Sequence, residues 1–394
     1  MSETKFYPLA ADTIGPEERA AIQQVVDSGY YTIGPKVAEF ESNFADYHGL
    51  KSAVMVNSGS SANLIATASL FFRQKNSLKA GDEVIVPAIS WATTYHPLQQ
   101  YGLKMKVVDI DLQTLNMDIE QLEAALSPRT RMIVAVSILG NPANLTEIKA
   151  FADKHDLYLM EDNCESLDAE TNGKKTGTFG LVNTSSFFFS HHISTIEGGM
   201  VATNDTETDH LLRALRAHGW TRDLPDESPL YQKRAGSDFF EAYRFLIPGY
   251  NVRSTEINAA IGIEQLKKLP SMTAARRKNL ALFQELFSGD DRFIIQRENG
   301  TSSSFCFPII LDPNRHLDRT SIMAAMDAAD IGYRIITGGN ILRHDVVKYY
   351  DFEAVGNMNN ANIAHDHGFF VGNQPFDLTQ QLERLREVLD RACK

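Results

Sequence analysis

Two adjacent histidines stand in the segment from Ser185 to Gly199, which reads SSFFFSHHISTIEGG. The first of them, His191, follows a run of phenylalanines and precedes a Gly-Gly turn. An unperturbed imidazole titrates at about pH 6.5, so a histidine can both accept and donate a proton near neutrality. A histidine pair is nevertheless more often structural than catalytic. His191 is therefore a candidate for proton transfer whose role depends on its neighbours.

Three further motifs are suited to an anionic, aromatic ligand. Gly59 and Ser60 lie between strand-like and helical sequence, where backbone amides can reach an anion. Asp162 closes an apolar run, and its carboxylate could pair with a positively charged ring nitrogen. Trp91 follows another strand-like run and could stack on a flat ring. Taken alone, each motif has a plainer reading that is favoured: a tight turn, a helix cap and a core tryptophan.

These residues must be positioned by strands and helices that alternate through the first two thirds of the chain. Such alternation predicts a mostly parallel sheet covered on both faces, and ligands bind such sheets at the carboxyl ends of the strands. The expected strands are 53–56, 83–86, 106–109, 132–136, 157–160, 187–189 and 200–203, and the expected helices are 62–72, 118–126 and 144–155.

The character of the sequence changes after about Pro248. We expect two consecutive helices, strands at 293–295, 305–311 and 333–336, and a further helix at 319–329. The prediction is therefore an α/β protein with a large ligand-binding domain, residues 1–250, and a smaller α+β domain, residues 251–394. The polar, proline-containing loop 221–237 is a candidate mobile lid or dimer contact. The two consecutive helices are expected at 256–269 and 273–287.

The composition excludes several classes of protein. The 394-residue chain has a formal net charge of -12 and no long basic run, which argues against nucleic acid as its main partner. No apolar run approaches the roughly 20 residues that cross a bilayer, and residues 1–5 lack the features of a signal peptide. The three cysteines form no CxxC pair, so a single chain offers no four-cysteine metal site. We expect a cytoplasmic enzyme without a membrane or nucleic-acid partner.

Taken together and in order, the motifs resemble those of the DegT/DnrJ/EryC1 sugar aminotransferase family of fold-type I pyridoxal-phosphate enzymes. The resemblance runs from roughly Tyr7 to Leu389 and includes Glu-Asp-x-x-Glu, Ser-Phe-x-x-x-His, Glu-Gly-Gly, Arg-x-His-Gly and Tyr-Asn-x-Arg-x-x-Glu. His191 stands where the family has the lysine that anchors the cofactor covalently. The sequence of these segments is most similar to that of the sugar 3-dehydratases of the family. In those enzymes a histidine at this position is the base, and glutamate supplies the amine.

For the cofactor, pyridoxal 5′-phosphate or pyridoxamine 5′-phosphate, the resemblance implies a site in the large domain. Gly59 and Ser60 would hold its phosphate through backbone amides, and Ser186 would add a hydroxyl. Trp91 would stack on the ring, and Asp162 would pair with the ring nitrogen. A covalent link to His191 is not expected, because imidazole forms no stable Schiff base with an aldehyde.

The resemblance also implies roles for five positions in proton transfer, in substrate and cofactor contacts, and in the contact between subunits. His191 would move the protons, and Glu165 would orient the amine or hydrogen-bond the cofactor. His218 and Arg222 would contact the substrate carboxylate or assist the leaving hydroxyl. Asn251 would reach the phosphate bound by a neighbouring subunit, which implies a homodimer with shared active sites.

The resemblance also raises the question whether this protein binds an iron–sulfur cluster. A related group of 3-dehydrases carries paired histidines and an iron–sulfur cluster that downstream cysteines hold. This chain has no cysteine between Cys164 and Cys306, so we expect no such cluster.

Three activities remain open at this point. The first is dehydration at C-3 of a keto sugar for lipopolysaccharide or O-antigen biosynthesis, with L-glutamate converted to 2-oxoglutarate. The second is transfer of the glutamate amine to a keto or aldehyde sugar, such as an oxidised octulosonate, because the glutamate half of both reactions is the same. The third is a regulatory or sugar-binding role without catalysis, against which the retained Asp162, Trp91, Ser186 and Glu165 argue. We expect dehydration of a small sugar, free or nucleotide-linked.

Overall fold

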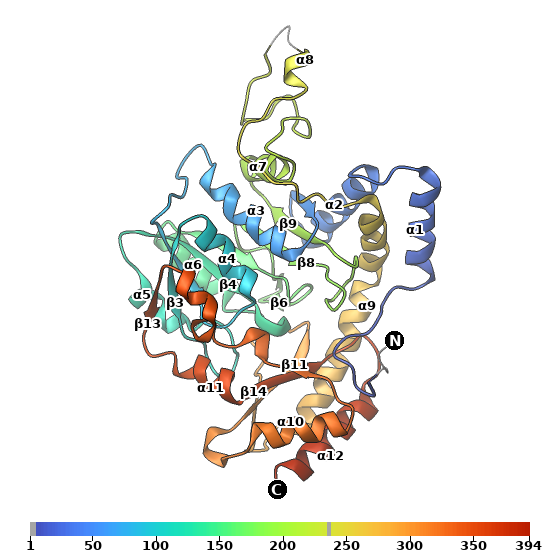
Figure 1. Ribbon diagram of the computed structural model, residues 1–394, viewed down its shortest axis with the longest axis vertical. Coiled ribbons are helices and arrows are strands. Elements are labelled where there is room, and N and C mark those ends of the chain that lie inside the picture. The colour runs from blue at the N-terminus through green and yellow to red at the C-terminus, as the bar shows by residue number, and fades with distance from the viewer. Residues whose placement is uncertain (1–4, 235–237) are drawn as a thin grey trace.

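The computed structural model describes residues 5–234 and 238–394. Residues 1–4, the start of the segment read above for a signal peptide, and 235–237, the end of the predicted lid, lie outside the described part. In Figure 1 a central body carries a projecting arm with α8 (Asp238–Glu241) at one end and a second domain at the other.

The central body is built on an eight-stranded sheet in the order β1-β9-β8-β5-β4-β2-β3-β13. Strand β9 runs antiparallel to both of its neighbours, and all other neighbouring pairs are parallel. This confirms the predicted mostly parallel sheet. The strands are β1 (Ser52–Val56), β2 (Glu83–Pro87), β3 (Lys104–Val108), β4 (Thr130–Val136), β5 (Tyr158–Asp162), β8 (Val182–Ser186), β9 (Gly199–Thr203) and β13 (Phe352–Val355).

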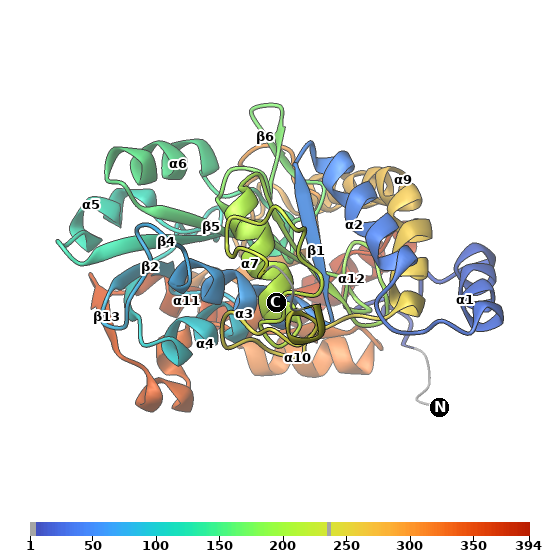
Figure 2. The same cartoon turned by 90° about the horizontal axis from the view of Figure 1, so that it is seen from above.

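Helices cover both faces of this sheet, as Figure 2 shows from above. Side chains alternate between the faces along each strand, so Val54 and Val56 of β1 pack on one side while Ala53 and Met55 pack on the other. One face is covered by α3 (Gly59–Phe71), α4 (Ala92–Gln100) and α7 (Thr206–Arg216), and the other by α2 (Pro35–His48), α5 (Leu122–Ala125), α6 (Leu145–Lys154) and part of α9 (Glu256–Phe287).

The second domain contains an antiparallel sheet in the order β10-β11-β14-β12. Segments from elsewhere cross between the domains: β13 joins the edge of the large sheet, and Tyr7 is buried in the second core. The boundary at residue 250 therefore stays a prediction. The remaining elements are α1 (Pro16–Ser28), β6 (Glu170–Thr171), β7 (Lys174–Lys175), β10 (Phe293–Ile295), β11 (Cys306–Leu311), α10 (Arg319–Ala328), β12 (Tyr333–Arg334), α11 (Asn359–His367), β14 (Gly368–Gly372) and α12 (Thr379–Ala392).

A single helix, α9, replaces the two helices predicted on either side of Pro270. It is 32 residues long and passes through the proline without ending. A proline removes one helical hydrogen bond, but packing can outweigh that loss. Leu269 and Met272 are both buried, so the apolar face of the helix continues across the proline. Neither α9 nor any other helix of the described chain is long and apolar enough to span a membrane.

The strand before the histidine pair lies earlier than predicted. The run 187–189 is apolar, yet the strand is β8, Val182–Ser186, which is rich in polar residues and fully buried. Its polar side chains are satisfied by hydrogen bonds, for example from Thr184 Oγ1 to Asn63 Oδ1 at 2.7 Å. Of the three phenylalanines only Phe187 is buried. Because β8 ends at Ser186, the residues that follow it form a loop at the carboxyl ends of the parallel strands.

Candidate active site

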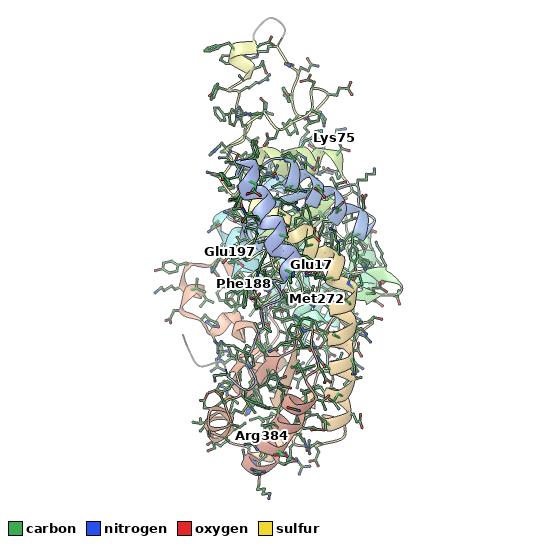
Figure 3. All side chains as sticks on the ribbon, turned by 90° about the vertical axis from the view of Figure 1, so that its right-hand side faces the viewer. Glu17, Lys75, Phe188, Glu197, Met272 and Arg384 are labelled. Carbon is green, nitrogen blue, oxygen red and sulfur yellow. The ribbon has the colours of Figure 1, made fainter. Side chains whose placement is uncertain are left out.

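A cavity of about 630 Å³ lies where the carboxyl ends of the parallel strands meet the second domain. Figure 3 shows Phe188 and Glu197, two residues of its wall, at mid-height, far from Arg384 in the second domain. Strand β1 runs in the same direction as β8, because both are antiparallel to the β9 strand between them. Strands β1, β2, β5 and β8 therefore all end on this side of the sheet. The predicted site residues that line the cavity are Gly59, Ser60, Trp91, Asp162, Glu165, Ser186 and His191.

The turn after β1 begins α3 and exposes the positive end of that helix to the cavity. Ser58 caps the helix by accepting a hydrogen bond from the amide of Ser61 at 3.1 Å. Gly59 has no room for a side chain, since a Cβ there would lie 2.5 Å from the Cβ of Ser186. Gly199 is equally restricted, because a Cβ would lie 2.3 Å from the carbonyl oxygen of Ser58. The close packing keeps the amides at the start of α3 free of side chains, which suits a bound anion.

Asp162 ends β5 with its carboxylate in the cavity wall and no basic side chain paired with it among the described residues. Its Oδ2 accepts hydrogen bonds from Asn63 Nδ2 at 2.8 Å and from Thr94 Oγ1 at 2.7 Å. Its Oδ1 accepts one from the amide of Cys164 at 3.2 Å. These bonds fix the orientation of the carboxylate. A fixed, unpaired carboxylate is suited to a cationic ring nitrogen.

Trp91 lies at the mouth of the cavity, not in the core. Its side chain is 60% exposed, although it directly precedes α4. Such exposure of a tryptophan leaves a large aromatic face without a stacking partner among the described residues. The ring is therefore available to stack on a flat ligand.

The imidazole of His191 is held between aromatic rings. Its ring centroid lies 6.2 Å from that of Phe188 and 5.1 Å from that of Phe305, both edge to face. Its Nδ1 is buried and has no hydrogen-bond partner in the described chain. Burial, followed by the positive charge of Arg276, lowers the pKa of His191 to about 4. The imidazole is consequently neutral at physiological pH and can accept a proton.

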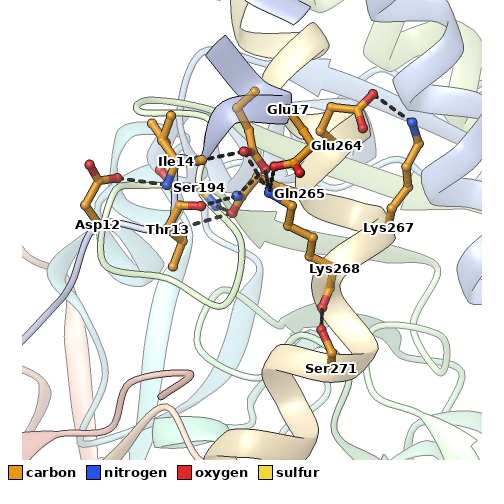
Figure 4. A network of polar contacts seen from close by, with 12 residues as sticks. Asp12, Thr13, Ile14, Glu17, Ser194, Glu264, Gln265, Lys267, Lys268 and Ser271 are labelled. Carbon is orange, nitrogen blue, oxygen red and sulfur yellow. Dashed lines mark hydrogen bonds and ion pairs between the residues drawn. The ribbon is translucent and has the colours of Figure 1, made fainter. Parts of the chain in front are cut away.

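The loop that carries His191 is tied to helix α9 by hydrogen bonds. Gln265 accepts one from the amide of Ser194 at 3.1 Å and also binds Thr13, as Figure 4 shows. Asn258 Nδ2 donates to the carbonyl oxygen of Thr195 at 2.7 Å. Because α9 is long and well packed, these bonds give the loop a rigid support.

Glu165 lies three residues after Asp162, in the wall of the same cavity. Its Oε2 accepts a hydrogen bond from the amide of Leu139 at 2.9 Å. Burial, with a smaller contribution from the negative charge of Asp162, raises the pKa of Glu165 to about 7, against the opposing effect of the Leu139 amide. Glu165 is therefore partly protonated near neutral pH and can donate a hydrogen bond.

His218, Arg222 and Asn251 lie outside this cavity, at the base of the projecting arm. All three side chains are exposed. Arg222 covers the ring of Trp220 at 5.1 Å, and Asn251 pairs through its backbone with Ala217. The structure thus groups these three with one another and away from the seven residues of the cavity.

A model of the DegT/DnrJ/EryC1/StrS aminotransferase family matches residues 12–383. The chain belongs to this family. It is 47% identical to GDP-4-keto-6-deoxy-D-mannose 3-dehydratase of Yersinia pseudotuberculosis over 386 residues, which cover 98% of each chain. The family membership predicted from the motifs is confirmed.

Solved structures of similar proteins agree in fold over nearly the whole chain. A structure of GDP-4-keto-6-deoxymannose-3-dehydratase with a trapped PLP-glutamate geminal diamine superposes with a TM-score of 0.95 at 47% identity, covering 97% of this chain and 100% of that one. A mutant of the same enzyme with bound GDP-perosamine gives the same TM-score, identity and coverage. The predicted fold-type I architecture is confirmed.

The residues of the cavity fit pyridoxal phosphate, the cofactor of this family. The start of α3 suits its phosphate, Asp162 its ring nitrogen and Trp91 its ring face. None of the described residues that line the cavity is a lysine, so the family's usual covalent anchor is missing. The described part of the chain also brings together no group of three or more His, Cys, Asp or Glu side chains able to hold a metal ion.

Sequence reasoning missed the residues that support the site. Asn63 lies one helical turn beyond Gly59 on the same face of α3, a spacing that could have indicated it. Thr94 and Phe305 carried no such signal, because they approach the cavity from other elements. The second domain supplies part of the wall through Phe305, Cys306, Arg334, Ile335, Thr337, Gly338 and Phe370.

Proposed function

We propose that this protein dehydrates a nucleotide-linked 4-keto-6-deoxy sugar at C-3, using pyridoxal phosphate, pyridoxamine phosphate and L-glutamate. The observation that carries the proposal is the neutral His191 in a pyridoxal-phosphate site whose described wall lacks lysine. The named substrates of the relatives at 47% identity support a GDP-linked sugar. Such sugars are used in lipopolysaccharide biosynthesis, and a cytoplasmic location stays a prediction.

Bound pyridoxal phosphate supplies an aldehyde that takes up the glutamate amine and a ring that accepts an electron pair from the adjacent carbon. Asp162 stabilises the positive ring nitrogen and so strengthens this electron sink. The amides at Gly59 and Ser60, with the hydroxyl of Ser186, hold the phosphate. Trp91 covers the ring and limits its movement, which matters more here because no lysine tethers it.

His191 moves the protons in both halves of the reaction. In the first half it would accept the Cα proton of glutamate and return a proton to the cofactor carbon, and water would then release 2-oxoglutarate and leave the amine form of the cofactor. In the second half it would take up the proton lost from that same carbon as the C-3 hydroxyl leaves as water. Hydrolysis would then free an amine-bearing sugar that tautomerises and loses ammonia. A lysine at this position would compete by capturing the cofactor. Histidine does not, so the amine form persists until the hydroxyl leaves.

Glu165, in its protonated form, donates a hydrogen bond that orients the amine or the cofactor. His218, Arg222 and Asn251 act on the site of a second copy of the chain, in a homodimer. Their shared position at the base of the arm, outside their own cavity, supports this assignment. His218 and Arg222 contact the substrate, and Asn251 reaches the phosphate.

The test is to incubate the protein with pyridoxal phosphate, nitrogen-15 glutamate and GDP-4-keto-6-deoxymannose, and to follow the label. Dehydration predicts labelled ammonia, a 3-deoxy keto sugar without nitrogen, and one 2-oxoglutarate per turnover. An amino sugar that retains the label would refute dehydration and establish an aminotransferase. Absence of any spectral change with glutamate would refute both enzymatic activities.

A further inference from the structure

Arg276, in the middle of α9, is a buried cation without an acidic partner. Its side chain is 3% exposed, and no Asp or Glu of the described chain pairs with it. It donates hydrogen bonds to the carbonyl oxygens of Phe305, at 3.2 Å, and Asn373, and its Nε has no partner. Burial lowers the pKa of Arg276 to about 10, which leaves it charged at neutral pH. A buried, unpaired charge is costly, so its presence beside an active site calls for a reason.

The hydrogen bond from Arg276 to Phe305 holds the segment 303–305, which we call the Phe305 shelf, against the histidine pair. The ring of Phe305 packs against His191 at 5.1 Å and His192 at 5.7 Å, between centroids. His192 Nε2 also lies 3.3 Å from the carbonyl oxygen of Ser303. The shelf therefore contacts both imidazoles.

Asn373 closes the network from the other side. Its Nδ2 donates to the carbonyl oxygen of Arg276 at 3.0 Å and to two oxygens of Ser304, at 2.9 and 3.0 Å. Helix α9, the end of β14 and the start of β11 are thus joined at one point. A displacement of Arg276 would move the shelf, and with it the rings that orient His191.

The charge of Arg276 acts on the same histidine. It opposes a second positive charge on His191 and on His192, in addition to the effect of burial. The other ionisable groups in the cavity wall are Asp162, Cys164, Glu165, Glu197, Cys306 and Arg334. Besides burial, the charge of Arg276 lowers the pKa of His191, so this cation favours the neutral, proton-accepting imidazole.

We propose that Arg276 is a positioning residue for His191: it clamps the Phe305 shelf against the imidazole and supplies an unpaired positive charge that keeps the imidazole in its proton-accepting form. This rests on the proposed function, in which His191 moves the protons. Arg277, the next residue of α9, provides a natural contrast. It also donates to a carbonyl oxygen of this region, that of Ser302, but its charge is paired with Glu298 at 2.9 Å.

The test compares R276Q, which removes the charge but keeps a donor, with R276K, which keeps the charge, and with R277Q as the matched control. The full-length protein, loaded with pyridoxal phosphate, is labelled at the histidine rings, and the His191 signal is assigned by its loss in H191N. Its protonation midpoint is followed by nuclear magnetic resonance, in parallel with the pH dependence of turnover.

We expect the His191 midpoint in R276Q to rise by about one pH unit or more, since a nearby cation is removed. The acidic limb of the turnover profile should rise with it, while R276K and R277Q keep the wild-type midpoint. An unchanged midpoint in R276Q would overturn the proposal. If R276Q does not fold, R276K still decides, because a raised midpoint in that variant would contradict the role of the charge. The resonance measurement does not depend on the product, so it remains valid if the sugar is aminated instead of dehydrated.

Discussion

At the scale of residues, His191 differs from histidines that a carboxylate orients in acid–base catalysis. Aromatic rings on two sides and a rigid loop fix it, and no acceptor binds its Nδ1 in the described chain. Burial and the charge of Arg276 lower its pKa and keep the imidazole neutral. The sequence could predict that His191 and Asp162 meet, because both follow strands of one parallel sheet. It could not predict Phe305, which approaches from a distant part of the chain.

The raised pKa of Glu165 makes stability depend on pH. Its folded-state pKa of about 7 exceeds the ordinary value of 4.5, so its contribution is fully present below pH 4.5 and is lost as the pH rises through 7. Glu165→Gln should therefore gain stability over the wild type between those values, by at most about 1.4 kcal/mol per pH unit. Thermal unfolding at pH 5 and pH 8 measures this, with the exposed Glu147→Gln as the control. A difference that stays constant or falls with pH would contradict the assigned protonation.

At the scale of elements, the site depends on where strands end, and the sequence patterns predicted the positions of the strands only in part. The apolar run 187–189 predicted a strand, but the buried strand is the polar β8. Hydrogen bonds to Asn63 and to the carbonyl oxygen of Ala202 satisfy its side chains, and such partners are visible only in three dimensions. A small-residue run between a strand and a helix predicted the turn before α3, but the helix begins at Gly59, three residues before the predicted start.

Gly59→Ala tests the fit of that turn to a phosphate. The new Cβ would lie 2.5 Å from the Cβ of Ser186 and force the two segments apart. We expect the dissociation constant for pyridoxal phosphate to rise roughly fivefold or more, because overpacking of this kind costs about 1–3 kcal/mol. Absorbance titration measures it. Gly15→Ala is the control, since its Cβ would approach only the flexible ends of side chains. Unchanged affinity in Gly59→Ala would place the phosphate elsewhere.

At the scale of the whole molecule, the projecting arm exposes a large amount of apolar surface. The exposed fractions are 93% for Phe239, 70% for Tyr243 and 57% for Phe245. Apolar surface of this kind marks an interaction site. A second copy of the chain is the occupant that a shared active site requires. The sequence indicated the arm by its polar, proline-containing composition, but a single chain cannot show which cavity the arm serves.

Complementation between two inactive variants tests the shared site. H191N lacks the base, and replacement of Asn251 by Ala removes the proposed phosphate contact to the other subunit. If the site is shared, a mixed dimer contains one intact site, and random mixing of equal amounts should restore about a quarter of wild-type turnover. Light scattering should give a mass twice that of the 43.9 kDa chain. No recovery in a verified mixed dimer would contradict the contribution of Asn251 from the second subunit.

The central claim is that His191 moves the proton of glutamate in a site that holds its cofactor without a lysine. Release of deuterium from glutamate deuterated at Cα, in the presence of pyridoxal phosphate, measures this step before any sugar is involved. The wild type should release the label and lose the absorbance of the aldehyde cofactor. H191N should bind the cofactor with similar affinity and release the label at less than about a hundredth of that rate. Release by H191N at the wild-type rate would show that another group is the base.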